Sequence, residues 1–266
     1  MGFFDQLRGF FTRFTRPSYA WPAMDVHLSG HRVLHLVGSI HMGTQNMSPL
    51  PARLLAKLRQ ADALIVEADI STHSSPFSDI TPEPALAERL SAADYQQVEA
   101  LCQELEINLS SLDNLPLWQI ALVLQAHQAQ RLGLRASYGI DYQLLQAARE
   151  LGKPVQELEG TQNQVELLTG LPQGGGILLK DTLNNWHTNA RLLQIMIGWW
   201  LESTPRKQEI HLPETFSEEM YQVLINQRNR QWSTFLQGLP AGHYVVAVGA
   251  MHLFGEGNLP ELLKNK

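Results

Sequence analysis

The chain has 266 residues, of which 44% are hydrophobic and 17% are charged, and its net charge at pH 7 is −6. This composition is that of a globular protein with a packed core and excludes a disordered chain. The negative charge argues against a nucleic-acid partner, which needs a basic face to neutralise phosphates. The single cysteine, Cys102, excludes an internal disulfide and a cysteine-based zinc site.

Residues 1–18 are predicted to be an amphipathic segment that precedes one domain over residues 19–266. Phe and Leu side chains recur at helical spacing in residues 1–16, with arginines between them. This pattern suits a helix that touches a membrane surface, or a helix that covers the body of the domain. The segment lacks the features of a secretory signal, and no later segment reaches the roughly 20 apolar residues of a membrane span. We therefore expect a cytoplasmic protein, with peripheral contact at the inner membrane as the alternative.

Short apolar stretches alternate with helical patterns along the chain. Strands are predicted at Val33–Ile40, Ala63–Val66, Val155–Leu158 and Tyr244–Val248. Helices are predicted at Ala52–Ala61, Ala92–Glu106, Leu117–Leu132, Ile140–Leu151, from Gln162 to a break at Pro172–Gly176, at Ile177–Leu201, at Thr215–Leu239 and from Asn258. This order predicts an α/β fold, with α+β as the alternative. Helices should flank a central, mostly parallel or mixed sheet, and the helix-rich middle should form an insertion.

Two segments near opposite ends of the chain share one pattern. Each is an apolar strand followed by Gly-x-x-His, at Gly38–His41 and at Gly249–His252. Glycine at the end of a strand permits a tight turn. The histidine then lies just beyond the carboxyl end of the strand, where α/β sheets bind their ligands. Neighbouring strands are about 4.8 Å apart, so two such imidazoles are close enough to bind one metal ion.

Glu67 follows the predicted strand Ala63–Val66 and should reach the same edge of the sheet. Two histidines and one carboxylate form a metal site that leaves a position open for water. Glu67 is expected either to bind the ion or to act as a general base on that water. Taken singly, each of the three residues suits a structural role, but the repeated motif favours a shared site.

With these residues in view, the chain resembles the TraB/GumN family, whose superfamily includes the Tiki proteases that inactivate Wnt. The family is marked by two Gly-x-x-His motifs and by a glutamate after the second core strand, which match Gly38–His41, Gly249–His252 and Glu67 here. The resemblance implies metal-dependent cleavage of peptide bonds as in the Tiki branch, with manganese or cobalt as the favoured ion, whereas most bacterial members of the family have no established substrate. Zinc also suits this donor set. A peptide or small-molecule substrate is expected, and a homo-oligomer remains open.

The likeness extends through the segment Gly139–Asp141, which follows Tyr138, and through the pair Arg228 and Asn229. Asp141 is expected either to hold a histidine tautomer or to stabilise a helix start. Arg228 is expected either to stabilise an oxyanion or a substrate carboxylate, or to lie on a solvated helix face. Tyr138, Asn229 and Glu159 are further candidates for contacts with the histidines or the substrate. The alternative function is a non-catalytic protein that binds a metal or small ligand, including a membrane-associated regulator.

Overall fold

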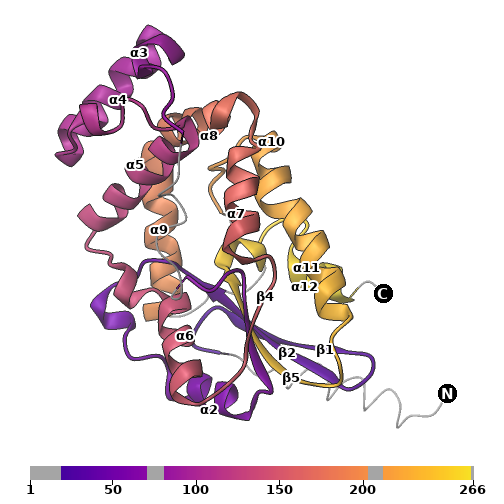
Figure 1. Cartoon of the computed structure of the whole chain (residues 1–266). Helices are drawn as coiled ribbons and strands as arrows, with labels where there is room; N and C mark the ends of the chain where they lie inside the picture. The colour runs from indigo at the N-terminus through magenta and orange to yellow at the C-terminus, as the bar shows by residue number, and fades with distance from the viewer. Residues whose placement is uncertain (1–18, 71–80, 203–211, 265–266) are drawn as a thin grey trace.

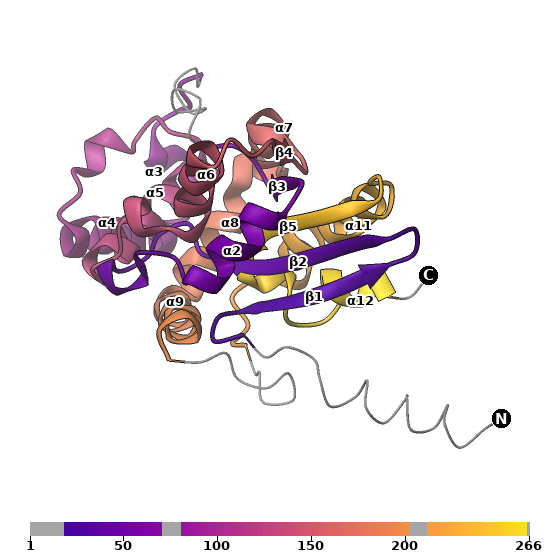
Figure 2. The same cartoon turned by 90° about the horizontal axis from the view of Figure 1, so that it is seen from below.

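The fold is built on one mixed sheet. The computed structural model describes residues 19–70, 81–202 and 212–264, so the predicted segment 1–18 lies outside the described residues. The strands are β1 (Ala23–Leu28), β2 (Arg32–Ser39), β3 (Ala63–Val66), β4 (Val155–Glu157) and β5 (Gly242–Gly249). They form the order β1-β2-β5-β3-β4, which Figure 2 shows from below. All neighbouring pairs are parallel except β1 with β2, which confirms the predicted mixed α/β fold.

Burial explains which strands could be predicted. Every residue of β3 is buried, and β2 and β5 are buried over most of their length. Continuous apolar strands of this kind are typical of a sheet covered on both faces. The edge strand β1 was not predicted, because Asp25 and His27 interrupt its apolar residues. Only Val26 in β1 is fully buried, as expected of an edge.

Helices cover both faces of the sheet. In Figure 1, α2 (Ala52–Gln60) and α6 (Ile140–Glu150) lie on one side, and α11 (Arg228–Gln237) and α12 (Leu259–Lys264) lie on the other. Their apolar faces and the strands form one core of buried residues. The carboxyl ends of four parallel strands therefore open toward the helices of the middle of the chain.

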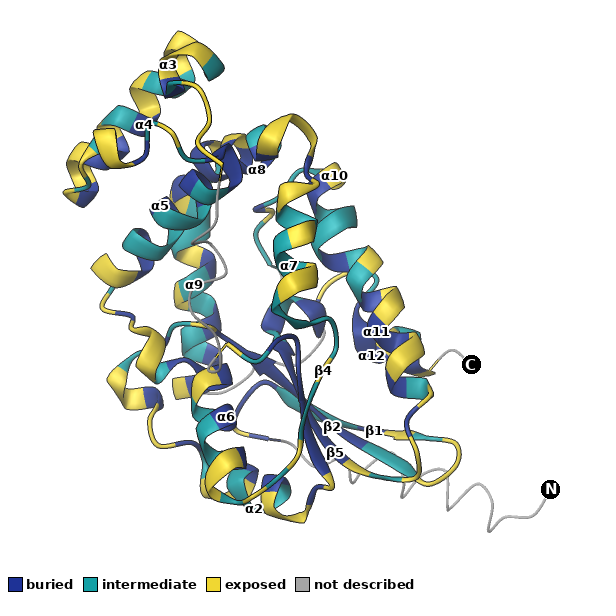
Figure 3. Cartoon of the chain, viewed as in Figure 1, coloured by how far each residue is buried: buried dark blue, intermediate teal, exposed yellow. Residues whose placement is uncertain are grey.

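A second core lies among the helices of the middle of the chain. Its buried leucines and Trp118 form a cluster distinct from that of the sheet, and Figure 3 shows exposed residues on the outer sides of these helices. The helices are α3 (Leu86–Arg89), α4 (Ala92–Leu105), α5 (Leu117–Arg131), α7 (Gly160–Thr169), α8 (Pro172–Asn184), α9 (Trp186–Leu201) and α10 (Glu218–Tyr221).

The predicted continuous helix Ile177–Leu201 is wrong, because the chain breaks at Asn185 between α8 and α9. Asn185 has φ −107° and ψ 23°, outside the helical range. Its side-chain amide donates to the carbonyls of Asp181, at 3.1 Å, and Thr215, at 3.3 Å. Side-chain hydrogen bonds of this kind compete with the helix ladder. The break turns α9 back toward the sheet.

The predicted helix Thr215–Leu239 begins later than expected and contains a π-helical segment. The chain passes from α10 through η5 (Gln222–Gln227), which is π-helical, into α11. Such segments occur frequently at functional sites, because the extra residue per turn changes the direction of side chains. Arg228 is the first residue after η5.

None of the helices within the described ranges combines the length and the apolar character needed to cross a bilayer.

A buried histidine in β2 makes the stability of the fold sensitive to pH. His35 is 4% exposed, and its Nδ1 lies 2.7 Å from Asp25 Oδ1. Lys57 and Tyr19 also hydrogen-bond to Asp25. Burial lowers the pKa of His35 below its ordinary value, and the hydrogen bond to Asp25 offsets this only in part. Below pH 6.5 the unfolded chain therefore binds a proton that the folded chain does not.

We expect the variant His35→Gln to lose less stability than the wild type as the pH falls from 6.5 to 5. One such histidine makes the free energy of unfolding fall by up to about 1.4 kcal/mol per pH unit in this range. Urea unfolding at several pH values measures the slope. The exposed His27 of β1 provides the control variant His27→Gln. Equal slopes for wild type and His35→Gln would contradict the prediction.

Candidate functional site

The two Gly-x-x-His segments lie side by side. β2 and β5 are adjacent and parallel, with Ser39 opposite Gly249. His41 follows β2, and His252 ends the short helix η6 (Ala250–His252) after β5. Both histidines line one cavity of about 400 Å³. Glu67 and Arg228 line the same cavity, so four separate segments of the chain meet there.

His252 is buried and held in one orientation. Its Nδ1 lies 2.8 Å from Asn229 Oδ1, and the Asn229 amide donates to the Gly257 carbonyl at 3.0 Å. The Asn229 oxygen therefore accepts a proton from Nδ1, which leaves Nε2 with its lone pair. Burial is the main cause that lowers the pKa of His252, to about 3, so the ring is neutral at pH 7.

His41 is held in the same manner but is open to solvent. Its Nδ1 lies 3.0 Å from Asp141 Oδ2, and its side chain is 65% exposed while that of Asp141 is 7% exposed. The Asp141 carboxylate raises the pKa of His41. Water screens this attraction because the ring is exposed. Asp141 and Asn229 are each the second residue of a helix, α6 and α11, so the two motifs share the way in which their histidines are oriented.

Glu67 lies at the end of β3 and is buried. Its Oε1 accepts the backbone N–H of Gly249 at 2.7 Å, and its Oε2 accepts from Arg228 at 2.5 Å. Burial raises the pKa of Glu67, but Arg228, the two histidines and the Gly249 N–H together outweigh burial and lower the pKa to about 2. The side chain is therefore a carboxylate at neutral pH.

Arg228 links the acidic groups of the site. Its Nε and one terminal nitrogen donate to Glu159, at 3.1 and 2.5 Å, and the same terminal nitrogen donates to Glu67. The other terminal nitrogen donates to the Leu224 carbonyl, at 3.1 Å, and to His252 Nε2, at 3.3 Å. These contacts account for all five guanidinium N–H groups. Two carboxylates face this guanidinium, and the Asp141 carboxylate pairs with His41, so the cluster carries excess negative charge even when His41 is protonated.

A glycine before α6 lets the Asp141 segment approach His41. A Cβ on Gly139 would overlap the backbone carbonyl of His41. The next residue, Ile140, donates its N–H to the Ile40 carbonyl at 2.9 Å. This close contact between backbones places Asp141 within hydrogen-bond distance of the imidazole.

The remaining predicted residues lie around the cavity and not on its wall. Glu159 holds Arg228, and Asn229 and Asp141 hold the histidines. Tyr138 does not line the cavity, and its hydrogen bonds within the described residues, to Gln143 and Arg135, use its backbone groups. A side-chain role for Tyr138 therefore has no support in the contacts of the described residues.

Trp232 was not predicted, yet it contacts two residues of the site. Its ring centroid lies 4.4 Å from that of His252, and the Arg228 guanidinium lies 4.6 Å from the Trp232 ring. Cations favour the faces of aromatic rings. The spacing of Arg228 and Trp232, four residues apart in one helix, was the signal available in the sequence.

The predicted ligands His41, His252 and Glu67 are not grouped as a preformed metal site. Among the described residues, no three His, Cys, Asp or Glu side chains are grouped as metal ligands. Of the predicted ligands, His252 and Glu67 approach each other to 4.0 Å, measured from Nε2 to Oε1. Arg228 hydrogen-bonds to both of these residues. An ion bound here would have to replace contacts of Arg228.

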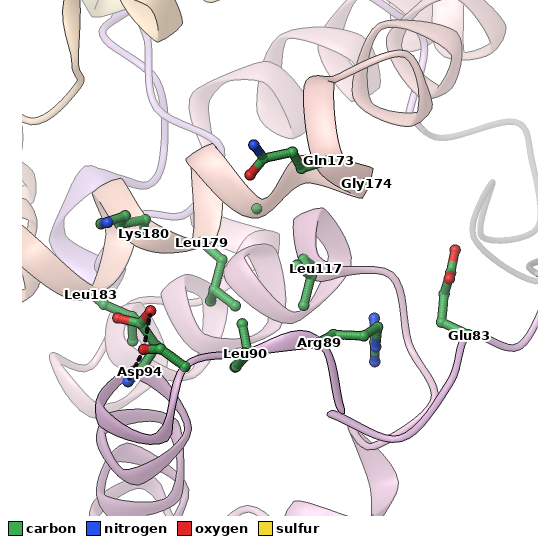
Figure 4. A pocket seen from close by; sticks show the side chains of 12 residues that line it. Glu83, Arg89, Leu90, Asp94, Leu117, Gln173, Gly174, Leu179, Lys180 and Leu183 are labelled. Atoms are coloured by element: carbon green, nitrogen blue, oxygen red, sulfur yellow. Dashed lines mark hydrogen bonds between the residues drawn. The ribbon is translucent and has the colours of Figure 1, made fainter. Parts of the chain in front are cut away.

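A second cavity, of about 500 Å³, lies among α3, α4, α5 and α8 (Figure 4). Arg89, Asp94 and Lys180 line it together with several leucines, and none of the predicted site residues does. The glycine-rich turn at its edge has a packing role, because a Cβ on Gly175 would overlap Trp118. The candidate site is therefore the cavity at the end of the sheet.

Comparisons with known proteins identify the family of the chain. The model of the TraB/PrgY/gumN family matches residues 24–266. The chain is 57% identical over 246 residues to proteins called uncharacterized protein YbaP in Escherichia coli K12 and in Shigella flexneri. In each case the match covers 92% of this chain and 93% of the relative. No solved structure matches the chain significantly. The chain therefore belongs to the TraB/PrgY/gumN family.

Proposed function

We propose that the chain is a metal-dependent hydrolase of amide or ester bonds, with peptides as its main class of substrate. The observation that carries the proposal is the orientation of two histidines from opposite ends of the chain. Both line one cavity with Glu67, and each has its Nδ1 bound to an oxygen acceptor. Metal-binding histidines in proteins are commonly oriented by such a partner.

The types and charges of these groups fit a divalent ion. His252 is neutral and keeps the Nε2 lone pair that a ligand needs. Glu67 is ionised, and Glu159 adds a second carboxylate against the single guanidinium of Arg228. An excess of negative charge favours a cation. We propose His41, His252 and Glu67 as the residues that hold it, with manganese, cobalt and zinc as candidates.

A divalent ion in this position would lower the pKa of a bound water and polarise the scissile carbonyl. Binding of the ion by His252 Nε2 would release the Arg228 N–H that now donates to this atom. That N–H would then be free to stabilise negative charge on the substrate. Glu159 keeps Arg228 at the edge of the cavity through two hydrogen bonds. Asp141 and Asn229 keep both imidazoles in one tautomer.

The direct test uses the full chain purified without chelator. We expect bound metal by elemental analysis, and hydrolysis of a peptide library that a chelator abolishes and that manganese, cobalt or zinc restores. The double variant His41→Ala/His252→Ala should lose metal, and its activity should fall by more than about 100-fold. The variant His243→Ala removes an exposed histidine of β5 and is the matched control. Unchanged activity in the double variant would contradict the assignment of the site.

A second candidate function is the non-catalytic binding of a small ligand. Two observations favour it: every N–H of Arg228 already has an acceptor, and the cavity beyond the histidines is lined mainly by apolar side chains. This function predicts saturable binding without turnover. Calorimetry beside the peptide assay separates the two functions.

A further inference from the structure

The cavity extends from the histidines into an apolar groove between helices. Side chains from α5, α9 and η5 form its walls, among them Ala126, Leu192, Met196 and Ile225. We call this extension the helical groove and define it by these four residues together with Gln128 and Thr215. An apolar wall next to a reactive site favours a ligand with a large apolar side chain.

Three buried polar residues line the same cavity. Ser39, Gln128 and Thr215 are 2%, 7% and 3% exposed. Each has one buried polar atom without a hydrogen-bond partner within the part of the chain that the structure describes: Ser39 Oγ, Gln128 Oε1 and Thr215 Oγ1. Buried polar atoms in native proteins nearly always have a partner. Three such atoms around one cavity point to a ligand with polar groups of its own.

The orientation of Gln128 defines what one of these groups must be. Its side-chain nitrogen donates to the Trp186 carbonyl at 2.8 Å, so Oε1 is the side-chain atom without a hydrogen-bond partner among the described residues. Oε1 can only accept a hydrogen bond, and the ligand must therefore donate one. Asn185, the neighbour of Trp186, holds the Thr215 carbonyl at 3.3 Å, so Gln128 and Thr215 are both tied to the junction of α8 and α9.

The cavity is also lined by Ser39, the last residue of β2, two residues before His41. The hydroxyls of Ser39 and Thr215 can each donate to a carbonyl. A peptide bond offers an N–H donor and a carbonyl acceptor, and a side chain lies next to each peptide bond. Peptide backbone with an apolar side chain thus matches the polar atoms and the apolar walls together.

We propose that Gln128 is a specificity-determining residue that accepts a backbone N–H of the bound peptide, next to a large apolar side chain in the helical groove. Thr215 and Ser39 donate to the carbonyls of the same segment. The inference rests on the proposed function for its substrate class. Binding can nevertheless be measured without turnover, so the two can fail separately.

The test compares acetyl-trileucine amide with analogues in which single amide N–H groups are replaced by ester oxygens. Calorimetry on the full chain, with chelator present to prevent hydrolysis, gives the affinities. We expect one ester replacement to weaken binding to the wild type about tenfold, which is the usual effect of one lost hydrogen bond. Replacing leucine by alanine should also weaken binding.

The variant Gln128→Met should bind acetyl-trileucine amide more weakly than the wild type does. It should also bind that peptide and the discriminated ester analogue with equal affinity. Gln125→Met is the matched control, because Gln125 lies one turn earlier in α5, lines the same cavity and bonds to Thr182. It should retain the tenfold difference. Thr215→Val, which keeps the shape of the side chain, should lower the affinity for the peptide and for its ester analogue by the same factor. This variant tests the helical groove if Gln128→Met does not fold.

Equal affinity of the wild type for the peptide and every ester analogue would overturn the inference, as would an unchanged difference in Gln128→Met. Peptide hydrolysis without any such discrimination would overturn this inference and leave the proposed function standing. If the wild type distinguishes the peptide from its ester analogue but hydrolyses no peptide with any metal, this inference stands and the proposed function is overturned.

Discussion

Replacing Arg228 with methionine is expected to lower the free energy of unfolding by about 3–5 kcal/mol, which is typical when one partner of a buried ionic network is removed. The buried Glu67 and the largely covered Glu159 would remain with no guanidinium between them. For a chain of this size the melting temperature should fall by about 10 °C. Urea unfolding in the presence of a chelator measures the change without a contribution from bound metal.

Two further variants test the cause of this loss. Arg230→Met removes an exposed arginine two residues along the same helix and should change stability by less than about 0.5 kcal/mol. Glu159→Gln in the Arg228→Met background should recover part of the loss, because it removes one of the two unpaired carboxylates. A small loss in Arg228→Met, or no recovery in the double variant, would show that the network does not stabilise the fold in this way.

Replacing Glu67 with glutamine is expected to reduce kcat/KM for peptide hydrolysis by about 100- to 10,000-fold, which is the range for loss of a general base. The amide oxygen can still accept from Gly249, but the charge that faces Arg228 and the histidines is lost. Initial rates on the best peptide of the library, with saturating metal, measure the effect.

The metal content of Glu67→Gln separates the two roles that remain open. If Glu67 binds the ion, the purified variant should lose metal as well as activity, and if Glu67 acts only as a base, metal should be retained. Glu157→Gln replaces an exposed carboxylate at the end of β4 that bonds to the Asp69 N–H, and it should change neither quantity. Full activity in Glu67→Gln would contradict any chemical role for this residue.

Much of the fold was predictable because burial leaves a local mark on the sequence. β3 was predicted with its observed bounds, and β2 and β5 to within two residues at each end, since apolar stretches bounded by glycine or acidic residues report burial on both faces of a sheet. The edge strand β1 was missed because Asp25 makes contacts with Lys57 and His35 that no local pattern indicates. The break at Asn185 depends on the carbonyl of Thr215, which is distant in the sequence.

The sequence by itself determined strands β2, β3, β4 and β5, most of the helices, and the approach of His41, Glu67 and His252 to one edge of the sheet. Apolar runs and the Gly-x-x-His spacing are local properties, and the helices between the strands favour parallel pairing. Only the tertiary structure decided that Arg228 lies between Glu67 and Glu159, that Asp141 and Asn229 orient the histidines, and that α5 and α9 enclose a groove beside them. These pairings depend on which helix faces meet when distant segments pack, and the periodicity of one helix does not contain that information.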